Sequence, residues 1–76
     1  MIDELRALVS DILGVNQSRI VPECGPGSLD NWDSLAHLSI ITAVEERFGV
    51  RFGMNEIRAI DSFGALSTAL SDRLAR

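Results

Sequence analysis

The feature that most limits the possible folds is a helical pattern interrupted by one long stretch that cannot be helical. Apolar residues recur at three- and four-residue spacing over residues 2–13 and again over residues 34–48, as in amphipathic helices. Between them, Pro22 and the Gly-Pro-Gly sequence at residues 25–27 break any helix, because proline lacks a backbone N–H and glycine is flexible. No strand-like alternation exceeds four residues. The pattern predicts helices joined by a long loop rather than a sheet.

Each predicted helix is bounded by residues that begin or end helices. The expected helices cover Ile2–Leu13, Ser34–Phe48, Met54–Ile60 and a last segment that opens at Asp61-Ser62 and runs to about Leu74. Gly14 and Gly49 follow the first two helices and predict left-handed C-terminal ends. Asn55 is the candidate cap of the short helix, and Ser62 that of the last. We therefore expect an all-α fold: a small four-helix bundle of three principal helices plus one short helix, with a long loop between helices one and two.

The long connection, residues 15–33, is unusual in a chain of 76 residues, because loops of this length are usually functional or disordered. We expect apolar side chains to hold it on the bundle, namely Ile20, Val21, Leu29 and Trp32. The inward positions of the last two helices are expected at Ile57, Ile60, Phe63, Leu66, Leu70 and Leu74. A chain of this length predicts a single domain, residues 1–76, with a small core. Its length and Met1 favour a free-standing protein.

The segment Ser34–Phe48 has apolar residues on two sides rather than one. At about 100° per residue, one arc is expected to face the core and contains Ile40, Ile41, Val44 and Phe48. The roughly opposite side contains Leu35, Leu38, Ser39, Thr42, Glu45 and Glu46. The few other helices are too short to cover both sides, so we expect the second side to face a partner.

Composition excludes several classes of partner and site. The net charge is −4, from 11 acidic residues against seven arginines and no lysine, which argues against nucleic acid and suits partners with basic surfaces. Cys24 is the only cysteine, so no internal disulfide can form, and with a single histidine we expect no metal site. Residues 1–4 are acidic, unlike a signal peptide, and no apolar run reaches membrane-spanning length. We expect a cytoplasmic protein that does not insert into membranes.

No catalytic constellation can be assembled from the sequence. Ser34 has Asp33 beside it and His37 three residues later, but the strained nucleophile turn and the oxyanion donors of a hydrolase are absent. His37 projects toward the core side of its helix, and we expect it to be a partly buried packing residue. Serine near a helix start most often caps backbone N–H groups, which is the plain structural alternative for Ser34. We expect a protein that is not an enzyme.

The sequence Asp33-Ser34-Leu35 at the head of a helix, in a small acidic helical chain, resembles the acyl carrier protein family. The resemblance spans nearly the whole chain: the first amphipathic helix, the long Gly/Pro loop, the Glu-Glu-Arg-Phe-Gly end of the second helix at residues 45–49, and a last helix opened by Ser62. Asp-Ser-Leu alone is a weak motif, and this helical order makes it specific. The N-terminus of a helix also favours a negative charge, such as a phosphodiester on Ser34.

The resemblance implies a carrier. Ser34 would be esterified with 4′-phosphopantetheine by a phosphopantetheinyl transferase, with Asp33 in a supporting role, and the arm would hold an acyl group as a thioester. The implied partner face consists of Leu35, Leu38, Thr42, Glu45 and Glu46. Further partners would be an acyl-loading ligase or acyltransferase and downstream synthase or transferase enzymes, which a monomer would visit in turn.

The chain also departs from the usual carriers of fatty acid synthesis. Ala36 and Ser39 stand where acids are common, Thr42 replaces a frequent methionine, and Arg47 interrupts the acidic run. Trp32 is more typical of discrete carriers of specialised pathways, such as polyketide or fatty-acid-like synthesis, although it also suits a loop anchor.

Two other functions remain open from the sequence. An aminoacyl or peptidyl carrier would share fold and cofactor, but such carriers usually have a Gly-Gly-His/Asp-Ser type sequence before the serine. An unmodified helical interaction module would keep its function after Ser34→Ala, whereas a carrier would lose it.

Overall fold

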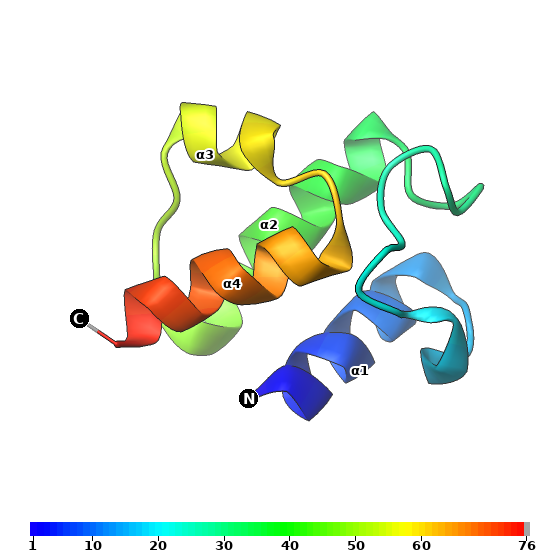
Figure 1. The fold of residues 1–76 in the computed structure, drawn as a ribbon, viewed down its shortest axis with the longest axis horizontal. Helices are drawn as coiled ribbons and strands as arrows, with labels where there is room; N and C mark the ends of the chain where they lie inside the picture. Colours follow the sequence, from blue (N-terminus) through cyan, green and yellow to red (C-terminus); the bar gives the residue numbers. More distant parts are fainter. Residues whose placement is uncertain (76) are drawn as a thin grey trace.

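The computed structural model describes residues 1–75. It contains four α-helices and one short 3₁₀ helix, joined by loops. They are α1 (Ile2–Leu13), η1 (Gln17–Arg19), α2 (Ser34–Phe48), α3 (Met54–Ala59) and α4 (Phe63–Leu74). In Figure 1, α1 and α2 run in opposite directions, α4 lies beside them, and the short α3 stands at one side of the bundle. No strand occurs within residues 1–75. The predicted all-α bundle with three principal helices and one short helix is therefore confirmed.

The ends of the first two helices follow from the predicted glycines. Gly14 and Gly49 adopt left-handed backbone angles, with φ of 69° and 68°, and each donates its backbone N–H to the last turn of its helix. A residue with a Cβ would be strained at these angles, whereas glycine adopts them readily. Local sequence therefore determines where α1 and α2 stop.

The cap predicted for α3 is wrong, and that predicted for α4 is confirmed. Ser62 precedes α4, and its hydroxyl accepts the Ala65 N–H at 3.0 Å. Asn55 lies inside the first turn of α3, and Gly53 is the residue before the helix. The Glu56 carboxylate reaches back to accept the Gly53 N–H at 3.0 Å, which leaves Asn55 no capping role.

The core is formed by one side of each principal helix together with anchors from the loop. The fully or nearly fully buried helical side chains are Leu5, Val9, Leu13, Ile40, Ile41, Val44, Phe63, Leu66 and Leu70. Ile60, directly after α3, is also buried, and Ile57 is partly buried against the core. Leu74 was expected to point inward but is 46% exposed, because it lies in the last turn of α4, beyond the core.

Apolar anchors hold the connection between α1 and α2 on the bundle. Ile20, Leu29 and Trp32 are buried as predicted, whereas Val21 is exposed. The chain turns after Val21, whose carbonyl accepts the Cys24 N–H at 3.0 Å, and this turn brings Cys24 into the core. The prediction for Val21 is therefore wrong because the turn reverses which side of the chain faces inward.

A side-chain hydrogen bond joins the same connection to α1, and a backbone hydrogen bond joins it to the start of α4. The Asn31 side chain donates to the Leu13 carbonyl at 2.8 Å, and Phe63 donates its N–H to the Cys24 carbonyl at 2.6 Å. Gly25 passes so close to the segment before α4 that a Cβ there would overlap the Asp61 carbonyl. The connection therefore follows one defined path to the start of α2.

Candidate functional site

Ser34 is the first residue of α2, and its side chain is exposed. The preceding Asp33 is the N-cap, because its carboxylate accepts the Ala36 N–H at 2.8 Å. The structural alternative, in which the Ser34 hydroxyl caps the helix, is therefore wrong. An exposed hydroxyl that is not needed for capping is available for modification by another molecule.

The position of Ser34 also suits an anionic substituent. The first backbone N–H groups of a helix have no acceptor within it, and the helix dipole adds partial positive charge there. Asp33 binds the Ala36 N–H through its side chain, and its carbonyl accepts the His37 N–H at 2.9 Å. The N–H groups of Ser34 and Leu35 precede these two in the first turn of α2.

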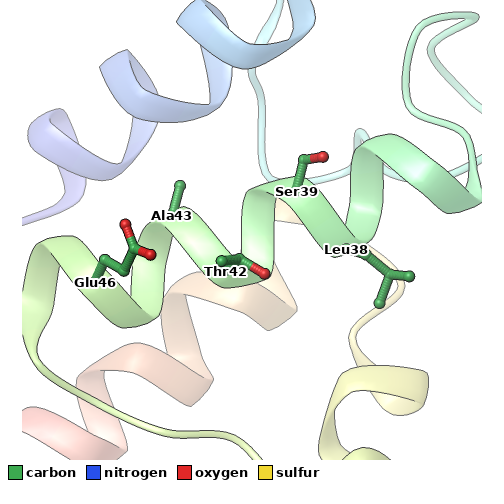
Figure 2. Close-up of a pocket in the computed structure, with 5 residues that line it drawn as sticks. All are labelled: Leu38, Ser39, Thr42, Ala43 and Glu46. Carbon is green, nitrogen blue, oxygen red and sulfur yellow. The ribbon is translucent and has the colours of Figure 1, made fainter.

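The solvent side of α2 has the composition that the helical projection predicts. Leu35 is 76% exposed and Leu38 is 52% exposed, which are high values for leucine, and Thr42 and Glu46 are exposed as well. Figure 2 shows five α2 side chains that line a shallow hollow of about 370 Å³, namely Leu38, Ser39, Thr42, Ala43 and Glu46. The second apolar side of α2 is therefore open to other molecules.

Glu45 differs from the other residues of the predicted partner face. It is only partly exposed, and its Oε2 accepts the backbone N–H of Phe52 at 2.9 Å. This hydrogen bond holds the link that follows α2 against the helix. Glu45 thus has a structural role that sequence periodicity did not reveal, because the donor lies in another segment.

Trp32 and His37 form a pair beside the candidate site. The indole Nε1–H of Trp32 donates to His37 Nδ1 at 3.0 Å, and His37 Nε2 lies 3.1 Å from the Ile57 carbonyl of α3. Trp32 is 1% exposed, so the loop-anchor interpretation of this residue is confirmed. His37 is partly buried and packs between segments, as predicted.

A cavity of about 390 Å³ lies next to Ser34, between α2 and α3. Its lining comes from both helices and from the segments beside them, namely Pro26, Ser34, His37, Leu38, Met54, Ile57, Arg58, Ile60 and Asp61. Most of these side chains are apolar, and Arg58 and Asp61 add one charge of each sign. The sequence did not predict this cavity, because its walls come from segments about twenty residues apart.

Cys24, the only cysteine, lies in the core and not at the site. Burial raises the pKa of its thiol, and the nearby Glu23 charge adds to this effect, while a backbone hydrogen bond at Val21 opposes it. A neutral buried thiol is unreactive.

Neither a metal-binding cluster nor a membrane-spanning helix is found among residues 1–75. No group of three histidine, cysteine, aspartate or glutamate side chains within residues 1–75 is arranged to hold a metal ion. In the same residues, every helix is too short or too polar to cross a bilayer.

The four-helix fold thus presents an exposed serine at the start of α2. No family model matches the chain. A curated relative, an acyl carrier protein from Thermosynechococcus vestitus, is 28% identical over 75 residues, which cover 99% of this chain and 93% of the relative. The solution structure of holo acyl carrier protein from Geobacter metallireducens superimposes with a TM-score of 0.88 at 24% identity, over 99% of this chain and 86% of that one.

These similarities support the prediction, made from the Asp33-Ser34-Leu35 motif, that the chain is a member of the acyl carrier protein family. The solved structure shows that the fold is the same. The curated relative is named as a carrier, which agrees with the prediction that the chain is not an enzyme.

Proposed function

We propose that this chain is an acyl carrier protein, modified with 4′-phosphopantetheine on Ser34, that delivers an acyl group to partner enzymes. The observation that carries the proposal is the exposed Ser34 hydroxyl at the start of α2, where Asp33 already caps the helix. Its family relatives, one of them a holo protein, support the same function. The proposal treats residues 1–76 as one carrier domain that acts as a monomer.

The residues around Ser34 fit such an arm. The hydroxyl is exposed, the start of α2 favours the negative charge of a phosphodiester, and the apolar cavity lies directly beside it. When attached, the arm supplies a terminal thiol that holds the acyl group as a thioester. The cysteine of the chain itself is buried in the core and does not compete for the cargo.

The chain's own part in the modification is to present one nucleophilic oxygen. In the transferase's site, the Ser34 oxygen would attack the pantetheine-linked phosphorus of coenzyme A. The hydroxyl proton would pass to a base in the transferase's site, and adenosine 3′,5′-bisphosphate would leave as its P–O bond to the attacked phosphorus breaks. Asp33 would orient the serine through the cap that it forms at Ala36.

The solvent side of α2 is the proposed docking face, with Leu35, Leu38, Thr42 and Glu46 as its exposed members and Glu45 at its edge. Exposed leucines next to the attachment point would bury apolar area against each partner. The proposed partners are a phosphopantetheinyl transferase, a loading ligase or acyltransferase, and a downstream synthase or transferase.

The residues of α2 favour a discrete carrier of a specialised pathway. Helix α2 is less acidic than in fatty acid carriers, because the uncharged Ala36 and Ser39 stand where acids are common, and Thr42 stands in place of a frequent methionine. A partner for this face would therefore rely more on apolar contact and less on basic residues. A thioester carrier also needs its thiol in the reduced form, which favours a cytoplasmic location.

The test is the intact mass of the purified protein after incubation with coenzyme A, magnesium and a broad-specificity phosphopantetheinyl transferase. We expect the gain of one phosphopantetheine in the wild type and none in Ser34→Ala. Ser39→Ala is a matched control on the same helix, since Ser39 is also exposed, and it should be modified like the wild type. No gain in a wild-type protein with its helical circular dichroism intact would contradict the proposal and favour an unmodified interaction module.

A further inference from the structure

One pair of hydrogen bonds connects the loop before Ser34, α2 and α3. We call it the Trp32–His37–Ile57 bridge. Trp32 donates to Nδ1 of His37, and Nε2 of His37 lies 3.1 Å from the Ile57 carbonyl. Its two helical members, His37 and Ile57, are 20 positions apart, and the bridge lies beside the cavity at Ser34.

The chemistry of the three groups determines how the bridge is protonated. The indole N–H can only donate, so Nδ1 of His37 must be the accepting nitrogen. In a neutral imidazole the proton is then on Nε2, which donates to the Ile57 carbonyl. Both ring nitrogens are therefore used, and the loss of either partner leaves one of them without its bond.

The bridge matters because α3 has few other attachments. The helix has six residues, too few to be stable alone, and none of them is fully buried. At one end of α3, Glu56 forms an ion pair with Arg73 of α4. The Ile57 carbonyl belongs to the last turn, where no helical N–H is available to it, and His37 fills that place.

His37 and Ile57 are also walls of the cavity next to Ser34. The separation between the α2 wall, with Leu38, and the α3 wall, with Met54, depends on what joins the two helices at this point. When the bridge is intact, α3 is held against α2, and the open cavity between them has a volume of about 390 Å³.

We propose that His37 is a positioning residue: through the Trp32–His37–Ile57 bridge it holds α3 against α2 and so limits how far an acyl chain tethered at Ser34 can enter the cavity. The occupant follows from the tether, since Ser34 itself lines the cavity. This gating role rests on the proposed carrier function, whereas the bridge itself can be tested without it.

The first experiment measures hydrogen exchange of backbone amides in the unmodified protein. His37→Leu removes both bonds of the bridge, and Trp32→Phe removes only the indole donor. We expect the Ile57 and Ile60 amides, which donate to Gly53 and Glu56, to exchange about threefold to tenfold faster in both variants, as expected for the loss of a net hydrogen bond.

Two controls separate the bridge from general destabilisation. The amides of α1 around Val9 report global unfolding and should keep their protection relative to α3. Leu38→Ala trims the same cavity wall without touching the bridge, and it should leave α3 exchange unchanged. Equal acceleration in α1 and α3, or none in α3, would overturn the bridge as the attachment of α3.

The second experiment measures gating in the modified protein. Ser34 is loaded with an octanoyl or an acetyl arm from the corresponding coenzyme A thioester, and cleavage by hydroxylamine is timed. We expect the cleavage of octanoyl relative to acetyl to be slower in His37→Leu than in the wild type, because the longer chain enters the widened cavity further. An octanoyl-to-acetyl ratio that is the same in both proteins would overturn the gating role.

The two failures are distinguishable. A chain that accepts no arm at all would refute the proposed function, and the exchange comparison would still decide whether His37 holds α3.

Discussion

The connection between α1 and α2 and the helix α3 are held in place in opposite ways. The connection contains only the three-residue η1 as regular structure, yet Ile20, Leu29 and Trp32 are all buried. The helix α3 is regular, yet none of its six residues is fully buried. The comparison shows that side-chain burial and long-range hydrogen bonds, more than regular backbone, decide how firmly a segment is held.

The two segments lie on different sides of Ser34 and are attached to the bundle differently. The connection brings Asp33 and Ser34 to one fixed place through the buried Trp32 beside them. On the other side of the cavity, α3 is joined by the His37 bond and by the ion pair between Glu56 and Arg73. In the proposed carrier, the modified serine would lie on a firmly held segment next to a less firmly held wall, where cargo must enter and leave.

The largest expected effect comes from truncating the main anchor of the connection. Trp32→Ala should lower the free energy of unfolding by about 3–5 kcal/mol, because a fully buried aromatic side chain is removed and a cavity remains. Met54→Ala in α3 removes a side chain that is 64% exposed and should change it by less than about 0.5 kcal/mol. Urea denaturation measures the free energy of unfolding of both variants. Similar losses in the two would contradict the conclusion that the connection is held more firmly than α3.

The second largest loss of stability is expected where the connection passes close to the segment before α4. Gly25→Ala places a Cβ against the Asp61 carbonyl and should destabilise the protein by about 1–3 kcal/mol, since backbone must shift. At Gly53, before α3, the nearest atom is the flexible Glu56 carboxylate at 3.6 Å. Gly53→Ala should therefore have an effect below about 1 kcal/mol, and thermal unfolding of the two variants side by side is the measurement.

A smaller effect is expected at the other attachment of α3. Glu56→Gln removes the ion pair with Arg73 and weakens the acceptor of the Gly53 N–H. Both side chains are partly solvated, so global stability should fall by only about 0.2–1 kcal/mol, and less at high salt. Local exchange of the α3 amides should rise, whereas loss of protection throughout α1 would show that α3 is part of one cooperative unit.

The smallest effect is the pH dependence that Cys24 adds to the connection. Burial raises the pKa of its thiol, so folding favours the neutral form. Its contribution to stability is complete below the pKa of the unfolded thiol and is lost as the pH rises through the higher folded pKa. Urea titrations across alkaline pH should show a decline that is weaker in Cys24→Ala. An equal decline in both proteins would assign it to other groups.

Sequence reasoning was most accurate where a few neighbouring residues decide the structure. The bounds of α1 and α2 agree with the prediction, because apolar periodicity and the glycines at residues 14 and 49 act locally. Errors arose where neighbouring residues compete for one role: the Glu56 side chain rather than Asn55 completes the cap of α3, and a turn from Val21 to Cys24 brings Cys24 rather than Val21 into the core. The position of Ser34 at a helix start was predictable. Whether its hydroxyl caps the helix depended on the orientation of the Asp33 side chain, which forms the cap instead.

The sequence by itself determined the helical order, the long connection, the two-sided character of α2 and the serine at its head. These features depend on spacing, glycine and proline, which act within a few residues. Only the tertiary structure decided that Trp32 and Ile57 meet at His37, that Glu45 holds the Phe52 N–H, and that a cavity opens beside Ser34. Such hydrogen bonds join different segments of the chain, between five and 20 positions apart, and side-chain spacing alone does not encode which donor will reach which acceptor.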